Sequence, residues 1–132
     1  MIALDTNILV RLVLRDDEAQ AKSAERLFIR ARREQTHLFV SDIVLCELVW
    51  VLTARARLTR DDIADALEQL LRTELIVVGD IKSVHRALSA YRHGKADFAN
   101  YLIGEQARRA GADAVVTFDR GLRGETGFRY LA

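Results

Sequence analysis

Residues 38–52 read Leu38-Phe39-Val40-Ser41-Asp42-Ile43-Val44-Leu45-Cys46-Glu47-Leu48-Val49-Trp50-Val51-Leu52. The opening apolar residues are typical of a short buried strand, and Ser41 is suited to cap the helix that follows. A short apolar strand followed directly by a helix is the repeating unit of parallel-sheet proteins. From Ile43 onward this helix is apolar except at Glu47.

Glu47 needs an explanation of its own. On a helix it shares a face with apolar residues, namely Ile43, Val44, Leu48 and Val51. This predicts a carboxylate that points into the interior or into the floor of a cleft. Because an unpaired buried carboxylate is very costly, Glu47 must be protonated, paired with a cation such as a core arginine, or bound to a metal.

The strand and helix unit recurs along the chain. The sequence predicts strands over residues 1–4, 38–40, 75–78 and 114–117, and a last edge strand over residues 128–131. Besides the helix that carries Glu47, it predicts helices over residues 7–14, 17–33, 59–72, 81–91 and 97–109, with a turn over residues 92–95. This alternation favours an α/β fold, a three-layer α/β/α sandwich around a mostly parallel sheet of about five strands.

The chain of 132 residues has the length of one domain, and no linker or repeat divides it. We therefore expect a single domain over residues 1–132. The longest apolar runs are too short to span a bilayer, and the N-terminus becomes polar at Asp5. The sequence thus predicts neither a transmembrane helix nor a signal peptide, and a cytoplasmic protein.

The formal net charge of +1 conceals a large excess of arginine over lysine, because only Lys22, Lys82 and Lys95 are lysines. Arginine makes planar, bidentate contacts with phosphate. Arginine groups occur within residues 30–33, 55–60, 108–109 and 120–123. They are suited to a nucleic-acid backbone, although solvated helix faces have the same composition.

Four acids are predicted to meet at one edge of the sheet, because ligands of such folds bind beyond the carboxyl ends of the strands. Asp5 ends the first strand and Asp119 follows the fourth, while Glu47 and Asp97 belong to the helices after the second and before the fourth. Taken singly, Asp5 and Asp97 are also typical helix N-caps and Asp119 a typical turn residue. Gathered carboxylates repel by roughly 4 kcal/mol at about 4 Å and need a cation.

The kind of cation follows from the ligands on offer. His37, His85 and His93 are scattered along the chain, and no His or Cys pair has the spacing of a zinc site. A site made of carboxylates, an amide and water suits Mg²⁺ or Mn²⁺. Such a site binds phosphate esters, because the metal neutralises their charge and activates water.

Four stretches carry a family resemblance. They are Ile2-Ala3-Leu4-Asp5-Thr6-Asn7-Ile8-Leu9-Val10, the segment from Ser41 to Leu48, Ala96-Asp97-Phe98-Ala99-Asn100-Tyr101-Leu102-Ile103, and Val116-Thr117-Phe118-Asp119. Together and in this order they resemble a PIN domain, most closely the VapC toxins of bacterial toxin–antitoxin pairs. The resemblance covers essentially the whole chain. It implies a divalent-metal ribonuclease that hydrolyses RNA phosphodiester bonds.

The resemblance also implies roles for single residues. It makes Asp5 the first metal ligand, Glu47 the second acid and Asp119 the acid after the fourth strand. It places Thr6, Asn7 and Thr117 around these ligands. The implied metal is Mg²⁺, with Mn²⁺ as a substitute, held by Asp5, Asp97, Asn100 and Asp119 and supported by Glu47 directly or through water.

Asn100 departs from the family pattern, because the third essential acid of the family usually stands at this place. Asp97 lies one turn earlier, and residues three apart share a helix face. An asparagine keeps the shape and one acceptor oxygen but removes a charge, so it is expected to weaken metal binding and catalysis. Two explanations are open: a deliberate substitution made to express a toxin safely, which we favour, or a natural variant in which Asp97 acts instead.

The mechanism that the resemblance implies is an in-line attack of water on phosphorus, which does not use the 2′-hydroxyl. The products should therefore carry a 5′-phosphate and a 3′-hydroxyl. Substrate choice would rest on shape and on arginine and aromatic contacts around the cleft. The nearest candidates are Tyr91, Arg92, His93, Lys95 and Arg120. A structured RNA such as tRNA is the substrate typical of the family.

The implied partners are a VapB-type antitoxin, a second copy of the chain in a homodimer, and operator DNA reached only through the antitoxin. The helices over residues 17–33 and 59–72 are suited to clamp an antitoxin segment, with Trp50 and Leu52 nearby. We expect most of their apolar stripe to be core.

Two other functions remain open. With Asn100 in place, the chain could be a catalytically silent module that only binds RNA or the antitoxin. A phosphoacceptor receiver domain shares the fold class, but it needs paired acids after the first strand and a late lysine. Asp5 is followed by Thr6 and Asn7, and no lysine follows Lys95.

Overall fold

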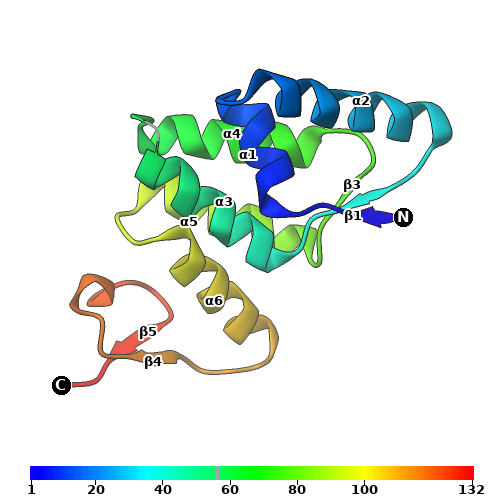
Figure 1. The fold of residues 1–132 in the computed structure, drawn as a ribbon. Coiled ribbons are helices and arrows are strands. Elements are labelled where there is room, and N and C mark those ends of the chain that lie inside the picture. The colour runs from blue at the N-terminus through cyan, green and yellow to red at the C-terminus, as the bar shows by residue number, and fades with distance from the viewer. Residues whose placement is uncertain (56) are drawn as a thin grey trace. The chain divides into compact units, whose positions relative to one another are not determined.

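The computed structural model describes residues 1–55 and 57–132. These residues form helices α1 (Thr6–Leu14), α2 (Glu18–Glu34), α3 (Asp42–Arg55), α4 (Arg60–Arg72), α5 (Ile81–His93) and α6 (Phe98–Arg109) and the short 3₁₀ helix η1 (Arg120–Leu122) (Figure 1). The strands are β1 (Ile2–Ala3), β2 (Leu38–Phe39), β3 (Ile76–Val77), β4 (Val115–Thr117) and β5 (Phe128–Tyr130). The chain divides into two compact units, residues 1–79 and residues 80–132.

The first unit contains a parallel sheet in the order β1-β2-β3. Ile2 pairs with Leu38, which in turn pairs with Ile76. Helix α1 packs against α2 and α3, and α3 packs against α4. The N–H of Leu4 donates to the carbonyl of Phe39 at 2.9 Å, so the carboxyl end of β1 is fixed immediately before α1 begins.

Helix α3 turns Glu47 away from the core. Its buried face consists of four apolar residues, Leu45, Leu48, Val49 and Leu52. The opposite face carries Glu47 between Ile43, which is 71% exposed, and Trp50, which is 51% exposed. The prediction that Glu47 points into the interior is therefore wrong, and so is the alternative that it pairs with an arginine of the core. A helix that is apolar on all sides does not indicate by periodicity which side faces the core.

The predicted helix starts are confirmed by their caps. Ser41 Oγ accepts a hydrogen bond from the N–H of Val44 at 3.2 Å. Thr59 Oγ1 accepts from the N–H of Asp62, whose carboxylate accepts from the N–H of Thr59 in return. Such reciprocal caps satisfy backbone groups that a helix leaves without partners.

In the second unit, α5 packs against α6 and α6 packs against β4. The buried rings of Tyr91 and Phe98 meet edge to face, with centroids 6.1 Å apart. The predicted turn over residues 92–95 begins later than expected, because α5 continues to His93 and the N–H of Gly94 bonds to the carbonyl of Ala90 at 2.8 Å.

All strand pairs among the described residues are parallel, which confirms the α/β prediction. The predicted edge strand is β5, which pairs with β4. The described strands form a three-stranded and a two-stranded sheet. A membrane-spanning helix is absent from the described part of the chain, since every helix there is too short or too polar.

Asp80 connects the start of α5 with the end of α6 in the second unit. It caps α5 by accepting hydrogen bonds from the N–H and hydroxyl of Ser83, and it forms an ion pair with Arg109 near the end of α6. The Ser83 hydroxyl, with a further contribution from the Arg109 guanidinium, holds the pKa of Asp80 below its ordinary value.

This lowered pKa predicts a pH dependence of stability. A carboxyl group whose pKa is lower in the folded state stabilises the fold at pH values above its unfolded pKa of about 3.9. This stabilisation is lost as the pH falls through the folded-state pKa. Asp80→Asn keeps a capping oxygen but removes the charge. We expect its Tm to lie below that of the unchanged chain at pH 7 and the gap to close as the pH falls through the lowered pKa of Asp80. Asp113→Asn is the control, because the Asp113 carboxylate bonds to no described residue. A Tm difference between Asp80→Asn and the unchanged chain that does not vary with pH would contradict the lowered pKa of Asp80.

The orientation of α3 predicts unequal effects of two neighbouring truncations. Leu45 is 0% exposed and Ile43 is 71% exposed. Leu45→Ala should lower the free energy of unfolding by about 2–5 kcal/mol, because it leaves a cavity in the core. Ile43→Ala should change it by less than about 0.5 kcal/mol. Urea unfolding measures both, and equal losses would show that the helix is turned differently.

Candidate active site

Asp5 stands between β1 and α1, at the carboxyl end of the strand. It is the N-cap of α1, and its Oδ1 accepts a hydrogen bond from the N–H of Thr6 at 2.8 Å. The alternative role of Asp5 as a helix N-cap is thus confirmed. Its second oxygen accepts no hydrogen bond from any described residue, and the side chain is exposed. Capping therefore leaves one carboxylate oxygen available to a ligand.

Thr6 has a hydroxyl without a partner. The residue is 5% exposed, and among the described residues its Oγ1 has no hydrogen bond. Buried side-chain oxygens are nearly always hydrogen-bonded, so this hydroxyl, next to Asp5 in the chain, is a candidate contact for a bound group or water. Asn7 follows in the first turn of α1 and is exposed.

Glu47 belongs to the same unit and lies on the exposed face of α3. Within residues 1–55 and 57–132 it takes part in no hydrogen bond or ion pair. An exposed carboxylate without a structural partner is free to bind water or a cation.

Asp97 and Asn100 lie at the start of α6 in the second unit. Asp97 takes the N-cap position, yet among the described residues its side chain forms no capping hydrogen bond. The N–H of Asn100 donates to the carbonyl of Asp97 at 3.1 Å, and both residues are half-buried. The Asn100 amide group itself bonds to no described residue. Their spacing places both on one helix face, as the sequence predicts.

Asp119 follows β4 and turns the chain into η1. Its Oδ1 accepts a hydrogen bond from the N–H of Gly121 at 2.8 Å, which confirms its turn role. Thr117 Oγ1 accepts from the N–H of Asp119 at 3.0 Å and so fixes the backbone from the strand side. As at Asp5, the second carboxylate oxygen accepts no hydrogen bond from a described residue, and the side chain is exposed.

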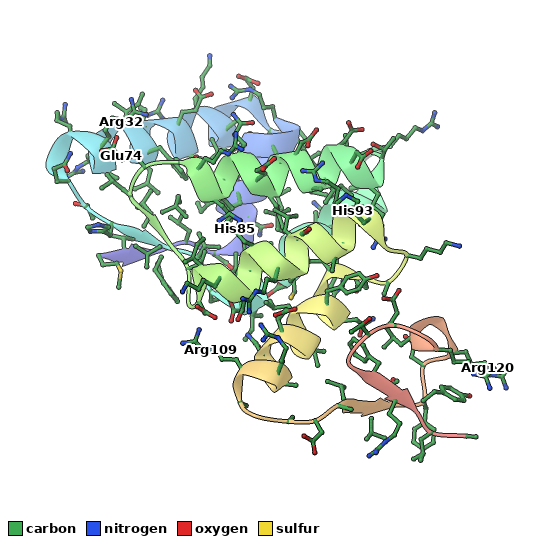
Figure 2. The ribbon with its side chains drawn as sticks, turned by 180° about the vertical axis from the view of Figure 1, so that it is seen from behind. Arg32, Glu74, His85, His93, Arg109 and Arg120 are labelled. Carbon is green, nitrogen blue, oxygen red and sulfur yellow. The ribbon has the colours of Figure 1, made fainter. Side chains whose placement is uncertain are left out.

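The three candidate RNA-binding cations all belong to the second unit. Lys95 and Arg120 are exposed and Arg92 is half-buried. Arg120 projects outward from the loop after β4 (Figure 2) and has no ion pair with a described acid. Other arginines are engaged, as the contacts of Arg30 with Glu34 and of Arg108 with Glu105 illustrate.

The candidate residues are divided between the units. Residues 1–79 contain Asp5, Thr6, Asn7 and Glu47, and residues 80–132 contain Asp97, Asn100, Thr117, Asp119 and the three cations. No group of three or more His, Cys, Asp or Glu side chains within the described residues is arranged to hold a metal ion.

The chemistry of the donors fits Mg²⁺ or Mn²⁺. Carboxylates, an amide and a buried hydroxyl are hard oxygen ligands, and the orphaned Thr6 hydroxyl and the unused oxygens of Asp5 and Asp119 are consistent with such a group. His85 and His93 project from α5 (Figure 2), and His93 Nδ1 is engaged with the carbonyl of Ser89.

Comparison with known proteins identifies the fold family. Residues 2–124 match the PIN domain. The chain belongs to the PIN-domain family. This PIN domain is 29% identical over 120 residues to the VapC ribonuclease of Aquifex aeolicus (strain VF5), an alignment that covers 91% of this chain and 88% of the relative. Family membership confirms the resemblance drawn from the motifs and the expected PIN-like α/β/α fold class.

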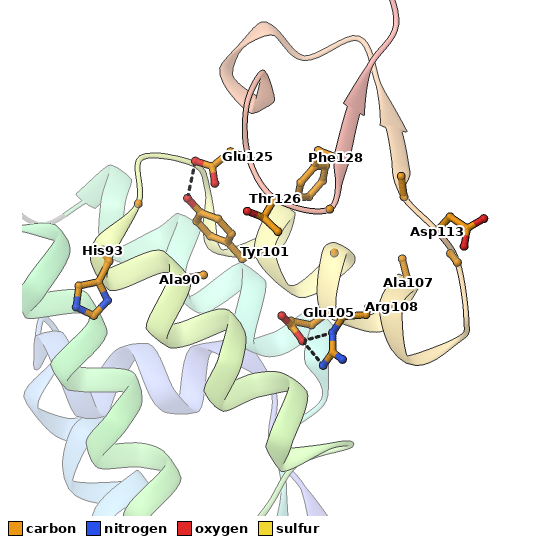
Figure 3. Close-up of a pocket in the computed structure, with 15 residues that line it drawn as sticks. Ala90, His93, Tyr101, Glu105, Ala107, Arg108, Asp113, Glu125, Thr126 and Phe128 are labelled. Carbon is orange, nitrogen blue, oxygen red and sulfur yellow. Dashed lines mark hydrogen bonds and ion pairs between the residues drawn. The ribbon is translucent and has the colours of Figure 1, made fainter.

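Sequence reasoning missed one contact near the candidate acids. The hydroxyl of Tyr101 bonds to Glu125, a residue 24 positions later (Figure 3). Tyr101 lies in the motif over residues 96–103, but Glu125 belongs to no motif, and no local spacing signals a pair so far apart in the chain. Only the fold brings them together.

Replacing threonine by valine should affect stability differently at Thr117 and at Thr6. Thr117→Val removes the acceptor for the N–H of Asp119 and should cost about 1 kcal/mol. Thr6→Val removes a hydroxyl that has no partner, so without metal it should be neutral or slightly stabilising. Urea unfolding in EDTA measures both. A loss at Thr6 equal to that at Thr117 would show that the Thr6 hydroxyl is hydrogen-bonded in the free protein.

Proposed function

We propose that this chain is the toxin of a toxin–antitoxin pair, a Mg²⁺-dependent endoribonuclease that hydrolyses phosphodiester bonds in RNA. The observation that carries the proposal is the similarity to a VapC ribonuclease along 91% of the chain. The family match over residues 2–124 includes every candidate acid and extends across both units. A single PIN domain over residues 1–132 is part of this proposal.

We assign the metal ligands to Asp5, Asp97, Asn100 and Asp119, with Glu47 in support, directly or through water. When bound, Mg²⁺ neutralises phosphate charge and makes water more acidic, and Mn²⁺ can replace it. The partnerless oxygens of Asp5 and Asp119 and the orphaned Thr6 hydroxyl support the assignment.

The chain's own residues contribute in three ways. Asp5 and Asp119 each use one oxygen to hold the backbone and turn the other outward, so their carboxylates are oriented before any ligand arrives. Thr117 fixes the backbone N–H of Asp119. The exposed Glu47 carboxylate accepts hydrogen bonds from water and orients it for attack on phosphorus.

Hydrolysis by water leaves the 2′-hydroxyl unused, so the products carry a 5′-phosphate and a 3′-hydroxyl. Arg92, Lys95 and Arg120 contact RNA phosphates in this proposal. The exposure of Arg120 directly after Asp119 supports it. Arginine suits this role because its planar group binds phosphate oxygens in pairs. A structured RNA such as tRNA is the proposed substrate.

The proposed partners are a VapB-type antitoxin and a second copy of the chain, with operator DNA reached through the antitoxin and a cytoplasmic location. Helices α1 and α4, with one residue each of α2 and α3, line an apolar groove of about 380 Å³ in the first unit, which supports antitoxin docking. Its lining includes Phe28 and Leu70. Trp50 is exposed, whereas Leu52 is buried and cannot contribute a contact.

A second candidate function is a catalytically silent module that binds RNA or antitoxin. Asn100 is the observation that favours it, because one ligand charge is missing at the place where the family usually has an acid. The two candidates differ only in whether Asp97 and the remaining acids suffice for catalysis.

Restoring the acid tests the proposal. Removing a residue that only orients a metal ligand lowers metal affinity or activity about 10–100-fold. Restoring a ligand itself by Asn100→Asp should therefore raise the rate of RNA cleavage at least about 100-fold. Cleavage should require Mg²⁺ and stop in EDTA. The measurement is a paired assay on total bacterial RNA with the product ends mapped, and Asn100→Ala is the matched control that restores no charge.

Each result of this assay has a meaning. Activity in Asn100→Asp alone identifies position 100 as the missing ligand. Equal metal-dependent cleavage by both chains assigns the third acid to Asp97. Cleavage by neither chain, with RNA or antitoxin still bound, favours the silent module, and 2′,3′-cyclic phosphate ends would refute hydrolysis by water.

A further inference from the structure

The hydroxyl of Tyr101 connects two segments of the second unit. It accepts a hydrogen bond from the N–H of Ala96 at 3.2 Å and donates one to Glu125 Oε1 at 3.1 Å (Figure 3). Tyr101 is 7% exposed, and its bond to the half-buried Glu125 is partly shielded from water. We call these contacts, from Ala96 through Tyr101 to Glu125, the hydroxyl bridge.

One end of the hydroxyl bridge holds the start of α6. Ala96 directly precedes Asp97, and Phe98 directly follows it. Phe98 is 0% exposed and packs edge to face against Tyr91. The backbone of Asp97 is therefore fixed by a hydrogen bond on one side and by a buried ring on the other.

The other end holds the loop that carries Asp119. The N–H of Glu125 donates to the carbonyl of Leu122 at 3.1 Å, and the N–H of Leu122 donates to the carbonyl of Asp119 at 3.1 Å. Leu122 is only 2% exposed. Hydrogen bonds and a buried side chain thus lead step by step from Glu125 back to Asp119.

A cavity of about 430 Å³ lies beside the bridge, and Tyr101, Glu125 and Phe128 are among the residues that line it (Figure 3). The ring of Phe128 also lies against Gly104 of α6, where an added Cβ would be 3.2 Å from the ring. The Tyr101 hydroxyl adds to this apolar contact a hydrogen bond that connects α6 with Glu125.

Gly94 makes room for the bridge. A Cβ added at this position would lie 1.9 Å from Tyr101 Oη and 2.8 Å from the carbonyl oxygen of Ala90. Since Gly94 has an extended backbone, the requirement for glycine comes from this close approach alone. Any side chain at position 94 would displace the hydroxyl.

We propose that Tyr101 is a positioning residue that sets the separation between Asp97 and Asp119 before metal binds. This inference rests on the proposed function, because it assigns both acids to one metal site. Carboxylates brought together without a cation repel each other, so the segments that carry them need an internal connection. The hydroxyl bridge supplies it without touching the metal or the RNA.

The test uses Tyr101→Phe, which keeps the ring and removes the hydroxyl, in the full chain with and without Asn100→Asp. The bridge itself is measured by hydrogen exchange of the Ala96 amide, which should become about tenfold faster or more. The affinity for Mn²⁺ should fall about 10–100-fold, which is the usual effect of losing a residue that orients a metal ligand. With RNA in the Asn100→Asp chain, kcat should fall while KM stays unchanged.

Three further variants complete the test. Tyr130→Phe removes a hydroxyl that bonds to no described residue and should change none of these quantities. Glu125→Ala should reproduce Tyr101→Phe, whereas Glu125→Gln keeps an acceptor oxygen and should restore Mn²⁺ affinity. Gly94→Ala should speed exchange at Ala96, because it displaces the same hydroxyl.

The outcomes separate positioning from simple stabilisation. A lower Tm for Tyr101→Phe with unchanged Mn²⁺ affinity and kcat would overturn the inference, as would unchanged exchange at Ala96. If Asn100→Asp cleaves no RNA but Mn²⁺ binding still depends on the hydroxyl, the proposed ribonuclease fails and the positioning role stands. If the Asn100→Asp chain binds no Mn²⁺, both fail.

Discussion

A helix begins with backbone N–H groups that have no partner within the helix, and this requirement links the fold of the chain to its chemistry. Asp5 and Asp119 each stand directly after a parallel strand, and each gives one oxygen to the N–H groups of the turn that follows. The capping bond restricts the side chain to one orientation. The second oxygen is then presented at the end of a strand, where ligands of parallel sheets bind.

Asp97 illustrates a different solution at the same kind of position. Among the described residues, its side chain gives no capping bond to α6, and the start of this helix is secured instead by Phe98 and by the Tyr101 hydroxyl. The start of α6 therefore does not depend on a side-chain cap from Asp97. The proposed ligand roles of Asp97 and Asn100 are compatible with this arrangement, because neither side chain is needed to cap the helix.

The sequence predicts the helices and strands well, because their signals are local. Ser41 and Thr59 cap helices as their spacing indicates, and the apolar run over residues 38–40 contains β2. Features that depend on distant contacts were not predictable. Glu47 could face either side of a helix that is apolar all round, and Tyr101 meets a partner 24 residues away. The roles of the acids came from their order along the chain and from the family resemblance.

The brevity of the strands also bears on how the chain folds. Strands β1 and β2 are each two residues long, and Ile2 must find Leu38 across an intervening stretch of roughly 36 residues. So few ladder bonds offset little of the entropy of closing so long a loop, and we expect the helices that fill the loop to pack before β1 pairs with β2. Asp5 caps α1 and lies at the end of β1. Its carboxylate is therefore oriented with the helix, whereas its place at the edge of the sheet is set only when β1 pairs.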